Sequence, residues 1–360
     1  MNVPSLYVAS ASKDSVGKTA LCLGLALNFM DLGLKVGYFK PIGRGNVKKG
    51  NRFIDSDSLL MKYALKLKEE PEILNPINLD YRYLETCLEV DCQSLLKKLK
   101  ECYSEISRDK DLIIIESLHE PCLGWSIGLS ATKVVNMLQS HILFISSTCK
   151  DEALDEILCK AHYSKLEGVK YAGVVFNSIR RESEERIKRL VIPLLKKRNL
   201  HVWGLIPYNS MITAPTVSEL VEVLSGEVLV GEENLSNMVE GFLVGAMRPE
   251  SAISYFRRYP RKAVITGGDR PDIALAAMET DTSAIILTGN LYPEVRVLAK
   301  AKERGIPIIL VSYDTYTTVQ KVQEISGKIK AGDTKRINLA KELVKEHVDF
   351  KGLLSYMGLK

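Results

Sequence analysis

The chain has 360 residues, of which 46% are hydrophobic and 26% charged, and its formal net charge is +5. This length favours two domains, and the composition is that of an ordinary globular protein. The charge is too small, and the basic residues too scattered, to predict a nucleic-acid partner. No apolar run approaches the ~20 residues of a membrane-spanning helix, and the N-terminus leads straight into a predicted strand, so no membrane partner and no secretory signal are expected.

The seven cysteines lie far apart, at positions 22, 87, 92, 102, 122, 149 and 159. They form no CxxC pair and no cluster with histidine at zinc-binding spacing. Scattered cysteines of this kind are typical of reduced thiols in a cytoplasmic protein. We therefore expect a cytoplasmic location.

Residues 6–19 have the sequence LYVASASKDSVGKT, in which an apolar strand leads through small polar residues into an apolar helix. This pattern is typical of a phosphate-binding loop, because the first amides of the helix and its dipole attract an anion. Lys18 is expected to reach the outer phosphates of a nucleotide, and the hydroxyl of Thr19 to hold Mg²⁺. The remaining residues of the predicted nucleotide-binding loop are Ser15, Val16 and Gly17.

The loop departs from the usual pattern at its first glycine, whose place falls on Ser12 or on Ala11. A residue other than glycine there must avoid positive φ or accept strain. Lys13 lies five positions before Lys18, a spacing that resembles the deviant loop of the partition and septum-site ATPases. In those proteins the early lysine reaches a nucleotide on a partner subunit, so the resemblance implies a catalytic role for Lys13.

Three further polar residues stand where strands end or helices begin. Glu116 ends the apolar run 112–116, as in a Walker B strand whose carboxylate contacts Mg²⁺ or its water. Lys40 follows a strand at 35–39 and can neutralise phosphate or a substrate carboxylate. Asp57 opens a predicted helix, which it can cap, or it can turn toward the metal.

Strands and helices alternate through the rest of the first 210 residues, with strands predicted at 142–147, 169–177 and 201–207 and helices at 93–106, 151–166 and 183–197. This alternation predicts an α/β fold of the P-loop NTPase type, with a mostly parallel, doubly wound sheet. Ligands of such sheets bind at the carboxyl ends of the strands.

Together these residues resemble dethiobiotin synthetase and its relatives, including the cobyrinic acid amide synthases. They are most similar to the dethiobiotin-synthetase-like N-terminal domain of long phosphotransacetylases. The motifs that carry the resemblance are SKDSVGKT at 12–19, GYFKP at 37–41, DSD at 55–57, NP at 75–76, IIIE at 113–116, VVFN at 174–177 and GLIP at 204–207.

The resemblance implies that ATP and Mg²⁺ are the cofactors. It implies that Asp57 and Glu116 help Thr19 to hold the metal, that Asn177 contacts the nucleotide base with Pro207 nearby, and that Lys40 lies near the acceptor substrate. Glu116 is followed by SLHEP, where dethiobiotin synthetase has a small glycine-rich turn. Nucleotide binding therefore carries over better than carboxylation of diaminopelargonic acid does.

The stretch from about 214 to 326 repeats the strand–helix alternation and resembles the DRTGG domain, through TGGDRPDIALAA at 266–277, LTGN at 287–290 and DTYTT at 314–318. That domain accompanies phosphotransacetylases and is usually regulatory or dimer-forming. Glycines before a helix can bind an anion with help from Arg270, or they can form a tight turn shaped by an Asp269–Arg270 network. The candidate residues are Gly267, Gly268, Asp269, Arg270, Thr288 and Asp314.

The expected domains are a nucleotide-binding domain at 1–212, a DRTGG domain at 213–326 and a helical tail at 327–360, which packs on a domain or on a twin subunit. The expected function is that of a regulatory or assembly ATPase, homodimeric, with a protein partner reached through the DRTGG domain. Because no acyltransferase domain follows, it would not make acetyl phosphate by itself. The alternatives are an ATP-dependent ligase acting on a small carboxylate or amine, and a scaffold whose nucleotide site has decayed.

Overall fold

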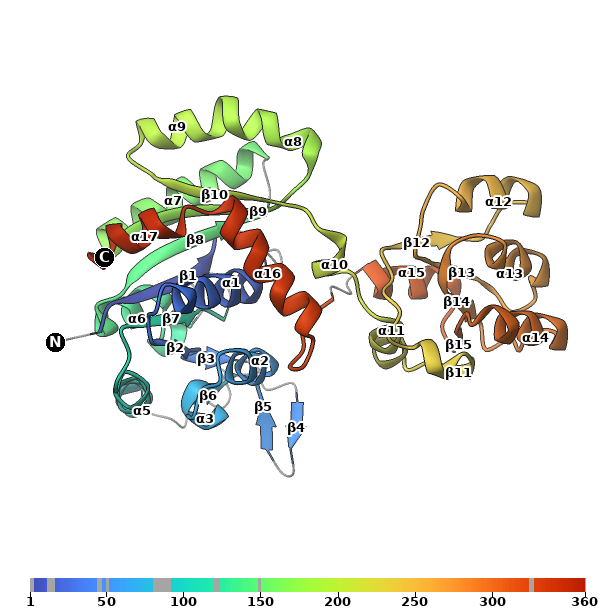
Figure 1. Cartoon of the computed structure of the whole chain (residues 1–360), viewed down its shortest axis with the longest axis horizontal. Helices are drawn as coiled ribbons and strands as arrows, with labels where there is room; N and C mark the ends of the chain where they lie inside the picture. The colour runs from blue at the N-terminus through green and yellow to red at the C-terminus, as the bar shows by residue number, and fades with distance from the viewer. Residues whose placement is uncertain are drawn as a thin grey trace. The chain divides into compact units, whose positions relative to one another are not determined.

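The computed structural model describes residues 3–11, 17–43, 47–49, 52–79, 92–118, 124–147, 150–323 and 327–359. The chain forms two compact units, of which the first comprises Met1–Tyr208 with Ile329–Lys360 and the second comprises Asn209–Lys328 (Figure 1). The second unit is thus inserted into the sequence of the first.

A six-stranded parallel sheet forms the centre of the first unit, with the strand order β10-β9-β8-β1-β7-β2. The strands are β1 (Ser5–Ser10), β2 (Val36–Phe39), β7 (Leu112–Glu116), β8 (His141–Ser146), β9 (Lys170–Ile179) and β10 (Val202–Pro207). Since all six run the same way, their carboxyl ends meet at one edge of the sheet. The predicted α/β fold with a mostly parallel sheet is confirmed.

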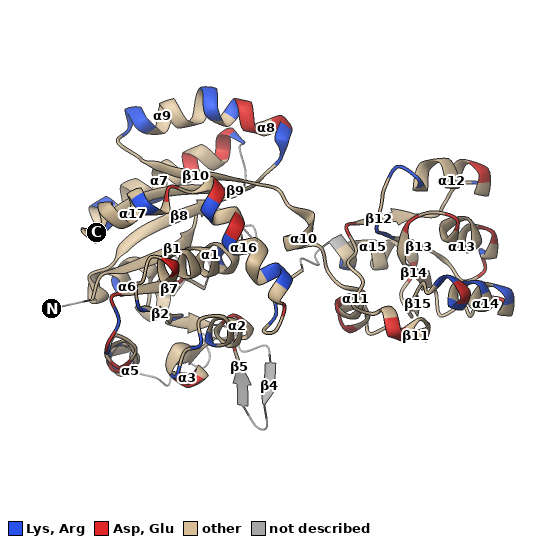
Figure 2. Cartoon of the chain, in the orientation of Figure 1, with Lys and Arg blue, Asp and Glu red and all other residues tan. Residues whose placement is uncertain are grey.

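Helices and short strands connect these six strands, and charged residues concentrate on the helices and loops (Figure 2). The helices are α1 (Lys18–Asp31), α2 (Ser56–Ala64), α3 (Pro71–Leu74), α5 (Cys92–Ile106), η1 (Trp125–Ile127), α6 (Ala131–Leu138) and α7 (Asp151–Leu166). The short strand β3 (Ile42–Gly43) pairs with β6 (Ile77–Asn78), and β4 (Val47–Lys49) pairs with β5 (Arg52–Ile54). In the described ranges, no helix is both long and apolar enough to span a bilayer.

The helix predicted at 183–197 is interrupted. It consists of α8 (Arg181–Arg186), the π-helical turn η2 (Ile187–Val191) and α9 (Ile192–Lys197). Pro193 lies at the start of α9. Proline has no N–H to donate and its ring crowds the carbonyl four residues earlier, so the regular hydrogen-bond ladder cannot continue through it. A π-helical turn is one way to accommodate such a break.

The C-terminal segment, predicted as a helical tail at 327–360, belongs to the first unit and forms two helices, α16 (Thr334–His347) and α17 (Phe350–Tyr356). The helices part at Val348, which is extended and bridges to Gly204 of β10. Asp349 then caps α17 by accepting a hydrogen bond from the amide of Gly352 at 2.9 Å. The change of direction lets the chain follow the edge of the sheet.

Helix α16 packs directly on α1, the helix that follows the phosphate-binding loop (Figure 1). The buried side chain of Asn28 donates to the carbonyl of Lys341 at 2.9 Å, and Lys341 Nζ lies 2.7 Å from a carboxylate oxygen of Asp31. The rings of Phe29 and Phe350 meet edge to face, with centroids 6.1 Å apart. Residues from the two ends of the chain therefore form one continuous part of the first unit.

Gly24 is the point of closest approach between α1 and α16. A Cβ atom at Gly24 would lie 2.6 Å from the carbonyl oxygen of Ala340 and would overlap a methyl of Val344. Helix propensity alone predicts that Gly24→Ala stabilises the protein by about 1 kcal/mol. We expect instead a net loss of about 1 kcal/mol, because overpacking costs about 1–3 kcal/mol.

Urea unfolding followed by tryptophan fluorescence measures this effect, since both tryptophans, Trp125 and Trp203, belong to the first unit. A Gly24→Ala variant more stable than the wild type would contradict the close packing of the two helices.

The second unit contains a five-stranded sheet with the order β11-β15-β14-β13-β12, in which β11 is antiparallel to β15 and the other pairs are parallel. The strands are β11 (Glu227–Val230), β12 (Gly241–Val244), β13 (Lys262–Gly267), β14 (Thr282–Thr288) and β15 (Ile308–Leu310). The helical segments are α10 (Ser210–Thr213), α11 (Val217–Leu224), η3 (Glu232–Asn234), α12 (Pro249–Phe256), α13 (Pro271–Met278), α14 (Val295–Arg304) and α15 (Thr315–Gln323).

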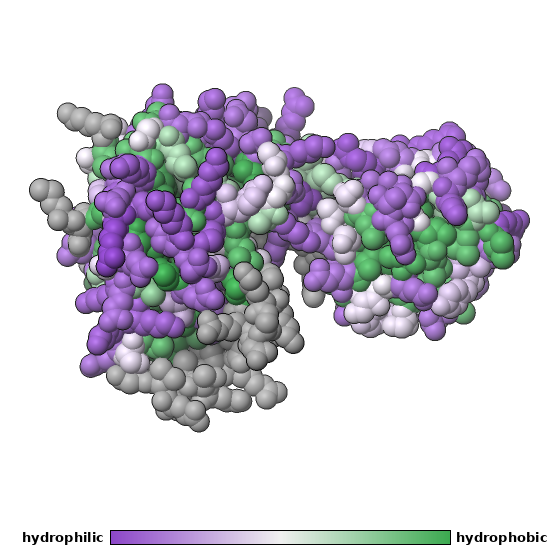
Figure 3. Space-filling view, turned by 60° about the horizontal axis from the view of Figure 1, so that its bottom comes forward, coloured by the Kyte–Doolittle hydropathy of each residue, from purple (hydrophilic) through white to green (hydrophobic). Residues whose placement is uncertain are grey.

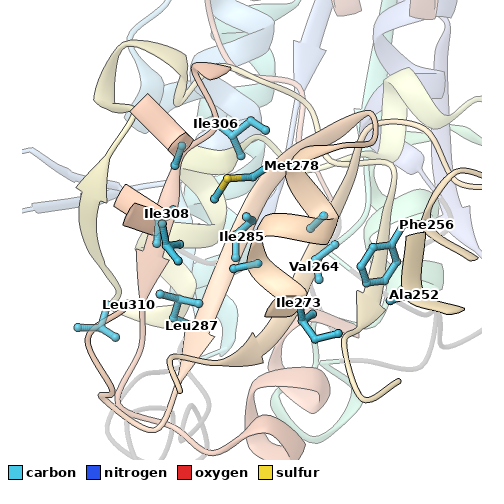
Figure 4. Packing of buried hydrophobic residues seen from close by; sticks show 14 residues of the cluster. Ala252, Phe256, Val264, Ile273, Met278, Ile285, Leu287, Ile306, Ile308 and Leu310 are labelled. Atoms are coloured by element: carbon cyan, nitrogen blue, oxygen red, sulfur yellow. The ribbon is translucent and has the colours of Figure 1, made fainter. Parts of the chain in front are cut away.

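Both faces of this second sheet are buried. Val264 and Ile285 pack with Phe256 and Ile273 on one face (Figure 4). Ile265 and Ile286, the next residue on each strand, belong to a separate cluster with α11 and α15 on the other face. Successive side chains of a strand point to opposite faces, so continuous apolar runs such as Ala263–Ile265 are needed to cover a sheet on both sides.

Hydrophobic side chains also reach the surface of the second unit (Figure 3). Its exposed large hydrophobic residues include Val244, Met247, Leu291 and Val295.

Candidate functional site

The phosphate-binding loop is described only from Gly17 onward, so Lys13, Ser15 and Val16 lie outside the described residues. Gly17 precedes α1 with φ of 75°, in the left-handed region that favours glycine. A Cβ at Gly17 would also overlap the side-chain amide of Asn177. Gly17 offers no side chain to cap α1, and this keeps the first amides of the helix available to an anion.

Lys18 points back toward the end of β1, where its ammonium donates to the hydroxyl of Ser10 at 2.8 Å. Burial lowers the pKa of Lys18, and the nearby carboxylate of Glu116 acts in the opposite direction. Sequence reasoning did not identify Ser10, because a serine at the end of a buried strand carries no motif of its own. This contact holds the Lys18 ammonium near the end of β1, on the side where phosphate binding is predicted.

Glu116 ends β7 and is almost completely buried. One carboxylate oxygen accepts a hydrogen bond from the Thr19 hydroxyl at 2.7 Å, and the other accepts from the hydroxyl of Tyr38 at 2.8 Å. Burial raises the pKa of Glu116, although Lys40, the Thr19 hydrogen bond and Lys18 oppose the shift. The structure thus brings together Thr19 and Glu116, two of the three predicted metal ligands, and it adds Tyr38, which sequence reasoning missed.

Lys40 follows β2 and is buried between two carboxylates. Its ammonium lies 3.0 Å from Asp55 and 2.5 Å from Asp57. Burial disfavours the charged ammonium, but the carboxylates of Glu116, Asp57 and Asp55 outweigh it and raise the pKa of Lys40. Asp55, rather than Asp57, caps α2, by accepting from the amides of Asp57 and Ser58. The side chain of Asp57 is therefore not needed as a cap.

Asn75, from the NP motif, fixes the backbone around Lys40. Its side-chain amide donates to the Lys40 carbonyl at 2.8 Å, while the Lys40 amide donates to the carbonyl of Leu74 at 2.8 Å. Gly43 approaches so closely that a Cβ there would lie 2.6 Å from Asn75 Oδ1. These contacts explain why a motif so far from the phosphate-binding loop in sequence belongs to the same site.

The site has the composition that a magnesium ion requires. Its described charged side chains are Lys18, Lys40, Asp55, Asp57 and Glu116, so the carboxylates exceed the cations by one. Mg²⁺ prefers oxygen ligands and commonly uses one or two carboxylates with phosphate oxygens and water. Among the described residues, no group of three or more His, Cys, Asp or Glu could hold a metal. The Thr19 hydroxyl and the Glu116 carboxylate, 2.7 Å apart, offer the oxygen ligands that Mg²⁺ can bind together with phosphate oxygens.

A cavity of about 690 Å³ opens where β8 and β9 end, next to Asn177. It is lined by Ser147, Lys150, Asp151, Glu152, Ser178, Arg180, Ser183 and Arg186. Arg186 forms an ion pair with Asp151 at 2.5 Å. Asn177 is nearly buried and Pro207, at the end of β10, is half-buried. Of the basic residues that line the cavity, Arg180 directly follows β9, Lys150 precedes α7 and Arg186 ends α8.

The six candidate residues of the second unit lie in or just after β13, β14 and β15. Arg270 forms two 2.9 Å hydrogen bonds with Asp272 and donates to the carbonyl of Met247 at 3.1 Å, where a network with Asp269 was expected. Asp314 accepts from the amide of Thr317 at 2.8 Å, at the start of α15.

The remaining contacts of this group lie within the second unit. Thr288 is hydrogen-bonded to Thr315 at 2.9 Å. A Cβ at Gly268 would overlap the carbonyl of Leu291, so this glycine permits a close approach of two backbones. These contacts account for Gly268, Arg270 and Asp314 through the local fold, and an anion site remains a prediction.

A family model described as "AAA domain" matches residues 5–216, more than half of the chain. The chain belongs to the AAA domain family. A second model, described as "DRTGG domain", matches residues 219–325. The AAA match covers most of the first unit but not its segment Ile329–Lys360, and the DRTGG match lies within the inserted unit.

The AAA domain protein is similar to curated phosphate acetyltransferases. It is 23% identical over 353 residues to that of Pseudomonas putida, covering 93% of this chain and 49% of the relative. It is 26% identical over 365 residues to that of Nitratidesulfovibrio vulgaris, covering 96% of this chain and 50% of the relative. The chain spans about half the length of the curated relatives it matches.

Solved structures similar to this AAA domain protein include the septum site-determining protein MinD of Pyrococcus horikoshii complexed with Mg-ADP, at 15% identity and a TM-score of 0.38, covering 58% of this chain and 83% of that one. Cobyrinic acid a,c-diamide synthase of Mycobacterium smegmatis with bound ADP and magnesium is 14% identical with a TM-score of 0.37, covering 57% and 87%. The CBS and DRTGG domains of a Clostridium perfringens pyrophosphatase are 19% identical with a TM-score of 0.29, covering 44% and 82%.

Proposed function

We propose that the AAA domain binds ATP with Mg²⁺ where β1, β2 and β7 end. The observation that carries this proposal is the 2.7 Å hydrogen bond between Thr19 and Glu116. Thr19 follows Lys18 at the start of α1, and Glu116 ends β7, the strand next to β1 in the sheet. The bond therefore joins the phosphate-binding loop to the Walker B acid. In P-loop proteins these two groups hold the metal of the nucleotide.

Each residue then has a role that its surroundings support. Lys18 and the first amides of α1 bind the phosphates, while Thr19, Asp57 and Glu116 hold the metal. Asn177 lies against Gly17 and is proposed to contact the base, with Pro207 nearby. The bound metal would supply charge neutralisation to the phosphates. If ATP is hydrolysed, positioning and charge compensation by Lys18, and by Lys13 from a partner subunit, provide most of the catalysis.

We propose that the protein acts as a regulatory or assembly ATPase, cytoplasmic and homodimeric, whose nucleotide state is communicated to a protein partner through the DRTGG domain. This role is supported by the fusion of the AAA domain, with its Thr19–Glu116 pair, to a DRTGG domain. An acetyl-transferring activity is not part of the proposal, because the chain corresponds to only about half of each curated relative.

Isothermal titration of the whole protein with Mg-ATP tests the proposal. We expect Lys18→Ala to weaken binding at least about tenfold, a loss of roughly 1.4 kcal/mol. In the part of the chain that the structure describes, the half-buried Lys18 ammonium donates one side-chain hydrogen bond, to Ser10, so its removal should leave the fold intact. Lys188→Ala, which removes an exposed lysine, is the control. Equal affinities for wild type and Lys18→Ala would reject nucleotide binding at this site.

The cavity at β8 and β9 favours a second candidate, an ATP-dependent ligase. A small carboxylate substrate would be held there by Arg180 and Lys150. Lys40, which the resemblance implies to lie near the acceptor, is instead buried at the end of β2, and β1 and β7 separate that strand from β8. The assay is ADP release in the presence of a panel of small acids, or of a diamine with CO₂. Stimulation by one acid, and its loss in Arg180→Ala, is the result expected of a ligase. Uniform ADP release across the panel would leave the regulatory role as the better explanation.

A further inference from the structure

Tyr38 lies inside the site, and the sequence motif that contains it predicts no function for it. It lies in β2, opposite Ile114 of β7, and its side chain is completely buried. Its hydroxyl donates to Glu116 Oε2 at 2.8 Å, while Thr19 donates to Oε1 of the same carboxylate at 2.7 Å. Both oxygens of Glu116 are therefore fixed by hydroxyl groups from two different elements.

Space filling alone does not explain the hydroxyl. The next residue of the strand is Phe39, also fully buried, so this strand accommodates an aromatic ring without a polar atom. A buried phenol usually has a hydrogen-bond partner, and a buried carboxylate oxygen without a donor costs about 1–3 kcal/mol. The bond from Tyr38 satisfies both groups, and it also selects one orientation of the carboxylate.

We propose that Tyr38 is a positioning residue for magnesium, acting through Glu116. By holding Oε2, it keeps Oε1 turned toward Thr19, so that the hydroxyl and the carboxylate are presented together before a nucleotide arrives. Hydrogen bonds from outside the ligand shell commonly orient metal-binding carboxylates in this way. The inference rests on the proposed binding of ATP with Mg²⁺.

The test compares ADP affinity of the whole protein in excess Mg²⁺ and in EDTA, because the ratio of the two measures the contribution of the metal alone. In Tyr38→Phe this ratio is expected to fall about tenfold, while the affinity in EDTA stays within about twofold. General damage to the site would weaken both affinities and leave the ratio unchanged. Tyr171→Phe is the matched control, since its hydroxyl lies in the same sheet, is buried and has no hydrogen-bond partner among the described residues.

A double variant separates orientation of Glu116 from other effects and covers the case in which Tyr38→Phe does not fold. In the variant that combines Tyr38→Phe with Glu116→Gln, the buried Glu116 carboxylate is replaced by a neutral amide, so the loss of the Tyr38 hydroxyl leaves no buried negative charge without its donor. Its ratio is expected to equal that of Glu116→Gln alone, since Tyr38 acts only through this carboxylate. A further tenfold fall, or an unchanged ratio in Tyr38→Phe, overturns the role of Tyr38. Absence of ADP binding by the wild type overturns the proposed function as well, which distinguishes the two failures.

Discussion

Replacing Lys40 with methionine is expected to destabilise the AAA domain by about 3 kcal/mol or more at neutral pH. The substitution removes the cation that lies 3.0 Å from Asp55 and 2.5 Å from Asp57, while both carboxylates remain. Asp55 is almost fully buried, and the charge of Glu116 also acts on Lys40. Breaking a buried ion pair from one side leaves an uncompensated charge, which is far more costly than losing an exposed pair.

Urea unfolding of the full chain, followed by tryptophan fluorescence, measures this loss. Lys188→Met is the control, because Lys188 and Glu184 form an exposed pair on α8 and η2 that is expected to contribute less than about 0.5 kcal/mol. The loss of stability in Lys40→Met should become smaller as the pH falls toward 5, because protonation of one carboxyl group relieves the repulsion among the buried carboxylates. Equal stability of the two variants at pH 7 would show that Lys40 does not compensate the buried acids.

Lys262→Met is expected to stabilise the DRTGG domain by about 2 kcal/mol at pH 7. Lys262 begins β13 and is fully buried, and its ammonium donates to the Thr280 hydroxyl and the Asp281 carbonyl, each at 2.8 Å. Burial lowers the pKa of Lys262 from 10.5 to about 8. This shift corresponds to roughly 3 kcal/mol, from which the two lost hydrogen bonds subtract.

The effect depends on pH in a defined direction. Between about pH 8 and 10.5 the unfolded chain holds a proton on Lys262 that the folded domain has released, so wild-type stability rises with pH. Below pH 8 both states are protonated and the full penalty is present. Scanning calorimetry of the full chain should therefore show the advantage of Lys262→Met at pH 7 and its disappearance by pH 10.5. If the stability gained by Lys262→Met does not change with pH, burying the charged ammonium of Lys262 does not destabilise the folded domain.

The parts of the site that sequence predicted are those fixed by backbone geometry. A parallel sheet brings the carboxyl ends of its strands together, so Glu116 and Lys40 could be placed at one edge without knowing any side-chain contact. Thr19 follows from the start of α1 in the same way. The DRTGG domain was predicted as a second α/β unit for the same reason, from its alternating strands and helices.

The parts that could not be predicted depend on which side chain meets which. Tyr38 is a residue type common in buried strands, and only the pairing of β2 with β7 brings it to Glu116. Ser10, at the end of β1, meets Lys18 at the start of α1 in a contact that no motif marks. Asp55 and Asp57 both suit a helix start, and only the structure shows that Asp55 is the cap. The return of α16 to α1 likewise depends on packing between distant segments, whereas the break near Pro193 follows from the local chemistry of proline.

The insertion of the second unit has a consequence for the order in which the protein is made. Helix α1 leaves the ribosome long before α16 and α17, yet these two helices cover the surface around Gly24 and Phe29. Domains generally fold as units during synthesis, and the N-terminal one usually folds first. Here the continuous stretch Asn209–Lys328 can complete its fold earlier, while the nascent AAA domain keeps an apolar face exposed until translation has passed residue 350.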